Sequence, residues 1–211
     1  MLKLYVGNKN YSSWSMRAGV LLKESRIPFE EVKVRFDALD AQSTFKQSLR
    51  YLTPVGKVPV LVDDGFAVWE SLAIAEYLAE KFPDRHLWPR DARARARARS
   101  VCAEMHSGFT ALRTHCPMNI EASLPHIGAL LMRDQSALRS DLERIVAMWS
   151  GLLDEHKGPL LFGGFTIADA FFAPVCSRLK TYALPGVKAW VDDALAEQDF
   201  RDFEEPYRVS R

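Results

Sequence analysis

Residues 10–17, which read NYSSWSMR, form the first of three segments that could carry chemistry, at the point where a strand pattern passes into a helix pattern. Loops at the carboxyl ends of parallel strands lie beside helix N-termini, whose free N–H groups and dipole favour anions. A serine hydroxyl placed there could donate a hydrogen bond to a bound thiolate. The alternative is that Ser12 or Ser13 only caps the helix.

The second segment is residues 53–61, which read TPVGKVPVL. Pro59 stands at the start of a strand pattern, where a proline has no N–H to donate to the sheet. If the bond between Val58 and Pro59 is cis, the Val58 backbone turns outward, and a peptide-like ligand can pair with it as an added strand. The alternative is an ordinary trans proline that enters an edge strand.

The third segment is Trp69-Glu70-Ser71, where a hairpin strand ends and a helix begins. The N–H and hydroxyl of Ser71 suit a carboxylate, and Glu70 can accept a hydrogen bond from an ammonium beside it. The head of a free amino acid carries both groups. The alternative makes Ser71 the N-cap of the helix and Glu70 a surface charge.

Strand and helix patterns alternate around these segments. Strand formers over residues 2–6 and 29–34 flank a helical pattern, which predicts a βαβ unit with parallel strands. A short polar helix is expected over 41–50. Strands over 58–62 and 66–69 flank an Asp-Asp-Gly turn, and a helix from Ser71 to Lys81 follows. The first domain is therefore expected to be a βαβ-ββα unit that spans residues 1–82.

The strand signal disappears after a proline-containing linker over residues 83–90. Helical patterns then predict an all-α domain over 91–211, with 117–130 partly loop or a broken helix. The expected helices are 91–115, 134–156, 166–182 and 186–197. Thr166 and Asp169 have the spacing of a capping box. The alternating arginines of residues 93–99 fall on different faces of a helix, which predicts a solvated or subunit-edge helix with dispersed charge. The alternative is a specific anion site.

The composition of the 211 residues, with 48% hydrophobic and 26% charged, is that of a globular protein. A net charge of +1 supplies no field toward nucleic acid or an anionic membrane, so neither is expected as a partner. The N-terminus has no leader pattern and no apolar run is long enough to span a membrane, which predicts a cytoplasmic protein. Three widely spaced cysteines form no metal or disulfide motif.

In their order and spacing, the three segments resemble the thioredoxin-like N-terminal domain of the cytosolic glutathione transferases. The segment from Phe165 to Asp169 is similar to the helix-start motif of that family's helical domain, so the resemblance covers nearly the whole chain. It implies an α/β thioredoxin-like domain followed by an all-α domain, glutathione as co-substrate without a metal, and a homodimer.

By the same resemblance, Val58 and Pro59 hold the cysteinyl backbone of glutathione, and Glu70 and Ser71 hold its γ-glutamyl head. Lys57 would meet the glycyl carboxylate of glutathione or, alternatively, be solvated.

The start of the first helix is similar to the serine-type classes, above all the zeta class, whose motif runs Ser-Ser-Cys and continues to an arginine. Ser12 then matches the catalytic serine, Ser13 its neighbour and Arg17 the arginine. Trp14 stands where the zeta class has cysteine, a departure that argues against the zeta reaction but not against glutathione binding.

The implied function is a transferase that activates the glutathione thiol for attack on a small electrophile. A pocket for this second substrate is expected between the domains. Its predicted lining is Tyr11, Trp14, Met105, His106 and Phe109. His106 has an alternative role as a structural histidine. Two other functions remain open: a zeta-like isomerase of the maleylacetoacetate type, and a non-catalytic binding module with the same fold.

Overall fold

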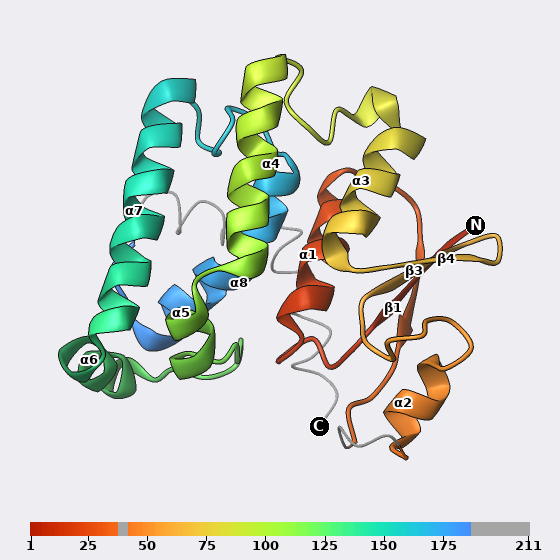
Figure 1. Cartoon of the computed structure of the whole chain (residues 1–211), viewed down its shortest axis with the longest axis horizontal. Helices are drawn as coiled ribbons and strands as arrows, with labels where there is room; N and C mark the ends of the chain where they lie inside the picture. The colour runs from red at the N-terminus through yellow and green to blue at the C-terminus, as the bar shows by residue number, and fades with distance from the viewer. Residues whose placement is uncertain (38–41, 187–211) are drawn as a thin grey trace.

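The computed structural model describes residues 1–37 and 42–186, in which an α/β domain lies beside a helical domain (Figure 1). The α/β domain has four strands and three helices, in the order βαβ, α, ββα. They are β1 (Leu2–Val6), α1 (Ser13–Glu24), β2 (Glu30–Lys33), α2 (Thr44–Leu49), β3 (Val60–Asp63), β4 (Phe66–Trp69) and α3 (Ser71–Lys81). The predicted thioredoxin-like fold class is confirmed.

The sheet has the strand order β2-β1-β3-β4, with β1 parallel to β2 and the other neighbours antiparallel. Alternate residues of β1 face opposite sides of the sheet. Leu4 and Val6 join the main core with α1 and α3, whereas Tyr5 packs toward Phe45 and Leu49 of α2. Helices therefore cover both faces, and α1 and α3 lie between the sheet and the helical domain (Figure 1).

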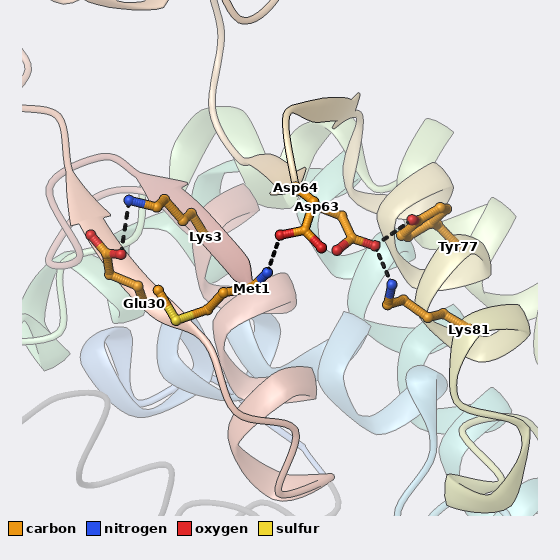
Figure 2. A network of polar contacts seen from close by, with 7 residues as sticks. All are labelled: Met1, Lys3, Glu30, Asp63, Asp64, Tyr77 and Lys81. Carbon is orange, nitrogen blue, oxygen red and sulfur yellow. Dashed lines mark hydrogen bonds and ion pairs between the residues drawn. The ribbon is translucent and has the colours of Figure 1, made fainter.

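A polar network holds the end of the sheet at which β1 begins (Figure 2), opposite the loop of residues 7–12 between β1 and α1, called the serine loop below. Asp63, at the end of β3, accepts hydrogen bonds from the Tyr77 hydroxyl at 2.6 Å and from Lys81, both of which are on α3. Next to it, Asp64 pairs with the N-terminal ammonium of Met1. These contacts fix α3 against the hairpin, so the start of the same helix has a defined position relative to β4.

The helical domain begins after a short 3-10 turn, η1 (Pro83–Arg85), within the predicted linker. Its helices are α4 (Ala92–Ser107), α5 (Thr110–His115), α6 (Pro125–Asp134), α7 (Ser136–His156) and α8 (Ile167–Tyr182). The prediction of one helix over 91–115 is wrong, because the chain turns at Gly108 and at Phe109, which has a φ of 53°. The helix predicted over 186–197 falls almost entirely outside the described residues.

The capping box predicted at the start of α8 is confirmed. The Thr166 side chain accepts from the Ala168 N–H at 3.3 Å. Asp169 accepts from the N–H and hydroxyl of Thr166 at 2.9 and 3.0 Å, and from the Leu161 N–H at 3.0 Å. The three bonds that this buried carboxyl accepts thus begin the helix and hold the preceding loop.

The two domains share one continuous hydrophobic core, in which α1 packs against α8. At the surface, Arg99 of α4 pairs with Glu76 of α3 at 2.8 Å. The arginine-rich stretch is therefore not wholly solvated, because one of its members connects the domains. Among the described helices, none has the length and apolar content to cross a membrane.

Candidate functional site

A pocket of about 170 Å³ opens where the start of α1, the segment before β3, the junction between β4 and α3, and α4 meet. Its walls come from both domains. The lining residues are Trp14, Val55, Lys57, Val58, Pro59, Trp69, Glu70, Ser71 and His106. Three segments that are far apart in the sequence, together with one residue of the helical domain, thus converge on a single cavity.

The peptide bond between Val58 and Pro59 is cis, which is the less common of the two alternatives that the sequence left open. Both residues line the pocket immediately before β3 begins at Val60. Lys57 precedes them and is exposed, so its ammonium can reach the pocket mouth without a cost of burial.

At the start of α3, the structure corrects the predicted cap. Glu70 occupies the N-cap position with a φ of 73°, and Ser71 is the first helical residue. The Ser71 side chain is only 2% exposed, and its hydroxyl has no hydrogen-bond partner in the described residues. A buried hydroxyl without a partner beside a helix N-terminus is a free donor for an anion in the pocket.

His106 reaches this pocket from α4 of the helical domain. Its Nε2 lies 3.7 Å from Oε2 of Glu70, and its ring centroid lies 5.1 Å from that of Trp14. The Nδ1 atom is buried and has no partner among the described residues. His106 therefore places an ionisable group of the second domain beside the carboxylate that the first domain contributes.

The structure places Ser12 at the N-cap of α1, but its hydroxyl makes no capping hydrogen bond. Instead, Ser12 Oγ lies 2.8 Å from Oγ of Ser15, which also accepts the Gly7 N–H at 3.1 Å. Ser12 is 7% exposed and is not part of the pocket wall, which Trp14 reaches from the same turn. The plain capping alternative for Ser12 is therefore wrong.

Asn10 connects the serine loop to the helical domain through hydrogen bonds. The Ile120 N–H donates to the backbone carbonyl of Asn10, and the Glu121 N–H donates to its side-chain oxygen, each at 3.4 Å. Its amide nitrogen in turn donates to the Glu121 carboxylate at 3.4 Å. At the other end of the loop, buried Lys9 pairs with Glu31 of β2 at 2.5 Å.

Two arginines, Arg17 and Arg113, lie close to the Trp14 ring. The Arg17 guanidinium stacks 4.1 Å from the Trp14 ring centroid, and that of Arg113 lies 5.9 Å from it. Burial, followed by the charges of Arg178 and Arg113, lowers the pKa of Arg17 to about 9, so Arg17 stays protonated at neutral pH. Nε and Nη1 of Arg17 have no hydrogen-bond partner in the described part of the chain.

Three of the five residues predicted for the second-substrate pocket are not in the cavity wall. Met105 is 0% exposed on the buried side of α4, Phe109 is 6% exposed in the turn after α4, and Tyr11 is exposed to solvent. The sequence analysis missed Val55 and Trp69, which line the cavity, and Ser15, which holds Ser12. All three lie next to or within segments that had been singled out.

Comparisons with known proteins find relatives over the whole chain. Models of the glutathione S-transferase N-terminal and C-terminal domains match residues 11–81 and 90–193. A probable maleylacetoacetate isomerase from Caenorhabditis elegans is 37% identical over 182 residues, which cover 86% of this chain and 80% of that protein. A glutathione S-transferase from Hypomyces subiculosus is 30% identical over 184 residues, with 84% and 85% covered.

Among solved structures, a glutathione transferase homologue from Burkholderia gl BGR1 with bound glutathione superposes with a TM-score of 0.71. It is 28% identical and covers 100% of this chain and 99% of its own.

Proposed function

Because the chain belongs to the glutathione S-transferase family, we propose that it is a glutathione transferase, which binds the tripeptide in the pocket between the domains and activates its thiol. The observation that carries this proposal is the convergence of Val58, Pro59, Glu70 and Ser71 on one cavity. The precise domain limits, residues 1–82 and 91–211, are part of the same proposal.

The charges of the pocket match those of glutathione, which carries two carboxylates and one ammonium at neutral pH. The Ser71 hydroxyl and the N-terminus of α3 suit the γ-glutamyl carboxylate. The Glu70 carboxylate suits the adjacent ammonium, and Lys57 suits the glycyl carboxylate at the other end. The backbone of Val58, between these ends, is placed to pair with the cysteinyl unit.

Activation of the thiol requires a modest free energy. A thiol with a pKa of ~8.5 is ~3% ionised at pH 7, and a pKa of ~6.5 raises this to ~75%, a change worth about 2.7 kcal/mol. A hydrogen bond to a charged group contributes ~1.5–3 kcal/mol, and a helix N-terminus ~0.3–1 kcal/mol. The Ser12 hydroxyl and the start of α1 can supply this sum together. The ionised sulfur then attacks an electrophilic carbon of the second substrate.

The test is calorimetric titration with glutathione of the wild type and Ser12→Ala, together with an ultraviolet titration of the bound thiol. We expect both proteins to bind glutathione with similar affinity, and only the wild type to lower the pKa of its thiol by about two units. If neither protein binds glutathione, the transferase function is wrong, and a non-catalytic module with the same fold becomes the better description.

A second candidate, glutathione-dependent isomerisation of the maleylacetoacetate type, is favoured by the two arginines close to the Trp14 ring. Maleylacetoacetate carries two carboxylates, and the protonated, buried Arg17 together with Arg113 would attract an anionic substrate. The name of the Caenorhabditis elegans relative fits this candidate as well. Tryptophan in place of the zeta-class cysteine argues against it.

Thiol consumption separates the two reactions, because conjugation uses one glutathione per product whereas isomerisation returns it. The free thiol is therefore counted during turnover with an activated aryl chloride and, separately, with maleylacetoacetate. Stoichiometric loss of thiol with the aryl chloride supports the transferase. Turnover of maleylacetoacetate without thiol loss supports the isomerase.

We also propose that the protein is a cytoplasmic homodimer whose partner substrate is a small electrophile. Tyr51 and Phe66 of the α/β domain expose 81% and 62% of their surface, which is apolar area that a second subunit would cover. The buried free thiols Cys102, Cys116 and Cys176 fit a reducing compartment. Sedimentation equilibrium tests the dimer, and a monomer at micromolar concentration would contradict it.

A further inference from the structure

Ser15 is a fully buried serine on the inner side of the first turn of α1, at 0% exposure. Its Oγ lies 3.1 Å from the Gly7 nitrogen, which donates to it, and 2.8 Å from Oγ of Ser12. The three groups form a short chain that begins at the end of β1 and leads to the proposed catalytic serine. Nothing in the capping of α1 requires this arrangement, because the Ser12 side chain makes no capping bond.

The direction of the bond between the two serines determines what Ser12 can do. Each hydroxyl has one proton, and a separation of 2.8 Å suits either direction of donation. If Ser12 donates to Ser15, its only proton is occupied. If Ser15 donates to Ser12, the Ser12 proton is free to meet a thiolate, while Ser15 still accepts the Gly7 N–H through a lone pair.

We propose that Ser15 is a positioning residue, which orients the Ser12 hydroxyl as a hydrogen-bond donor to the glutathione thiolate. When the thiol ionises, its proton leaves to solvent and the electron pair stays on sulfur. The donated bonds then run from Gly7 through Ser15 and Ser12 to the sulfur. Consecutive hydrogen bonds of this kind strengthen one another in a buried setting. The inference rests on the proposed function.

The spacing of the serines explains why this role falls to Ser15 and selects Ser12 over Ser13. Residues three apart share a face of a helix, so Ser12 and Ser15 meet at the first turn. Ser13 is rotated away from that face by its position one residue further along. The contact with Ser15 thus gives a physical reason to prefer Ser12 over Ser13, in line with the family resemblance.

The experiment compares wild type and Ser15→Ala, with glutathione affinity measured by calorimetry and the pKa of the bound thiol by ultraviolet titration. We expect Ser15→Ala to raise the bound thiol pKa by about one unit with glutathione affinity changed less than threefold. At pH 6.5, kcat should fall by up to about tenfold with KM little changed, and the loss should shrink as the pH rises. A purely structural serine would not move the pH profile.

Two further variants keep the result interpretable if Ser15→Ala is less stable. Thr166→Ala removes a helix cap that is not part of the pocket wall and should leave the bound thiol pKa at its wild-type value. The double variant Ser12→Ala/Ser15→Ala should show the same thiol pKa as Ser12→Ala alone, because Ser15 acts only through Ser12.

The outcomes separate this inference from the proposed function. A wild type that binds no glutathione, or binds it with an unshifted thiol, rules out the proposed function and this inference with it. A wild type that lowers the thiol pKa, with Ser15→Ala equally effective, overturns only the role of Ser15. A thiol pKa that is higher in Ser12→Ala/Ser15→Ala than in Ser12→Ala would likewise overturn only the role of Ser15.

Discussion

The starts of α3 and α8 each carry a hydroxyl residue and a carboxylate residue, but these residues differ in their hydrogen bonding. At α8, Thr166 and Asp169 satisfy one another and the surrounding N–H groups, with every bond between 2.9 and 3.3 Å. At α3, Glu70 has a φ of 73° and the buried hydroxyl of Ser71 has no partner in the described residues. Unsatisfied polar atoms and a backbone in the left-handed region are costly, and they persist where a ligand uses them.

The hydrogen bonds at α8 are those of a structural helix start, whereas the unsatisfied hydroxyl at α3 supports the proposed binding of glutathione there. Mutations at α8 should therefore lower stability, and mutations at α3 should lower affinity for glutathione.

The largest expected effect is on stability, from Asp169→Ala. This change leaves the donors of Leu161 and Thr166 buried without an acceptor, and each such group costs about 1–3 kcal/mol. We expect the free energy of unfolding in urea to fall by about 3 kcal/mol or more. Glutathione affinity, measured well below the unfolding midpoint, should stay within about threefold of wild type. A loss of affinity larger than the loss of stability would contradict the division between the two helix starts.

A smaller effect concerns pH. Burial raises the pKa of Asp169 from 3.8 to about 6, so this carboxyl holds its proton more tightly in the folded than in the unfolded state. Its contribution to stability is complete below pH 4 and is lost as the pH rises through 6, by about 3 kcal/mol. Asp169→Asn does not titrate, so the difference in unfolding free energy between the two proteins should change across this window. A constant difference from pH 4 to 7 would show that the carboxyl titrates normally.

The smallest expected effect on stability, with a clear effect on binding, is from Ser71→Ala. Since the hydroxyl has no hydrogen-bond partner among residues 1–37 and 42–186, its removal should leave the unfolding free energy within about 0.5 kcal/mol of wild type. The lost hydrogen bond to a carboxylate should weaken glutathione binding by about tenfold or more. Calorimetry and urea unfolding measure the two quantities. Unchanged affinity in this variant would place the γ-glutamyl head elsewhere.

Much of the fold was predictable because it depends on local patterns. The β4–α3 boundary, the Asp-Gly turn and the capping box are each encoded within a few residues, and the structure has them where they were expected. The break between α4 and α5 was not predictable from periodicity. A glycine such as Gly108 is tolerated in helices, and a phenylalanine rarely adopts the positive φ that Phe109 has here. Tertiary packing, which buries Phe109 in the core, decides that turn.

The site was predictable where a motif carried it and not where side-chain direction mattered. Val58, Pro59, Glu70 and Ser71 come together as the family resemblance implied. By contrast, Met105 and His106 are neighbours on one helix, yet only His106 reaches the cavity, because consecutive helical residues point about 100° apart. The pairing of Ser12 with Ser15 needed coordinates, since a serine near a helix start has several possible partners.

The hydrogen bonds between Asn10 and residues 120–121 affect how chimaeras between this protein and its relatives have to be designed. The loop that carries Ser12 belongs to the first domain in sequence, but Ile120 and Glu121 of the second hold it in place. In a chimaera joined at the linker, the serine loop of this protein would face the residues that a relative has at positions 120 and 121. An exchange of the helical domain therefore has to keep residues 119–121 matched to the serine loop. The residues that form this site have to be exchanged together, although they come from two domains.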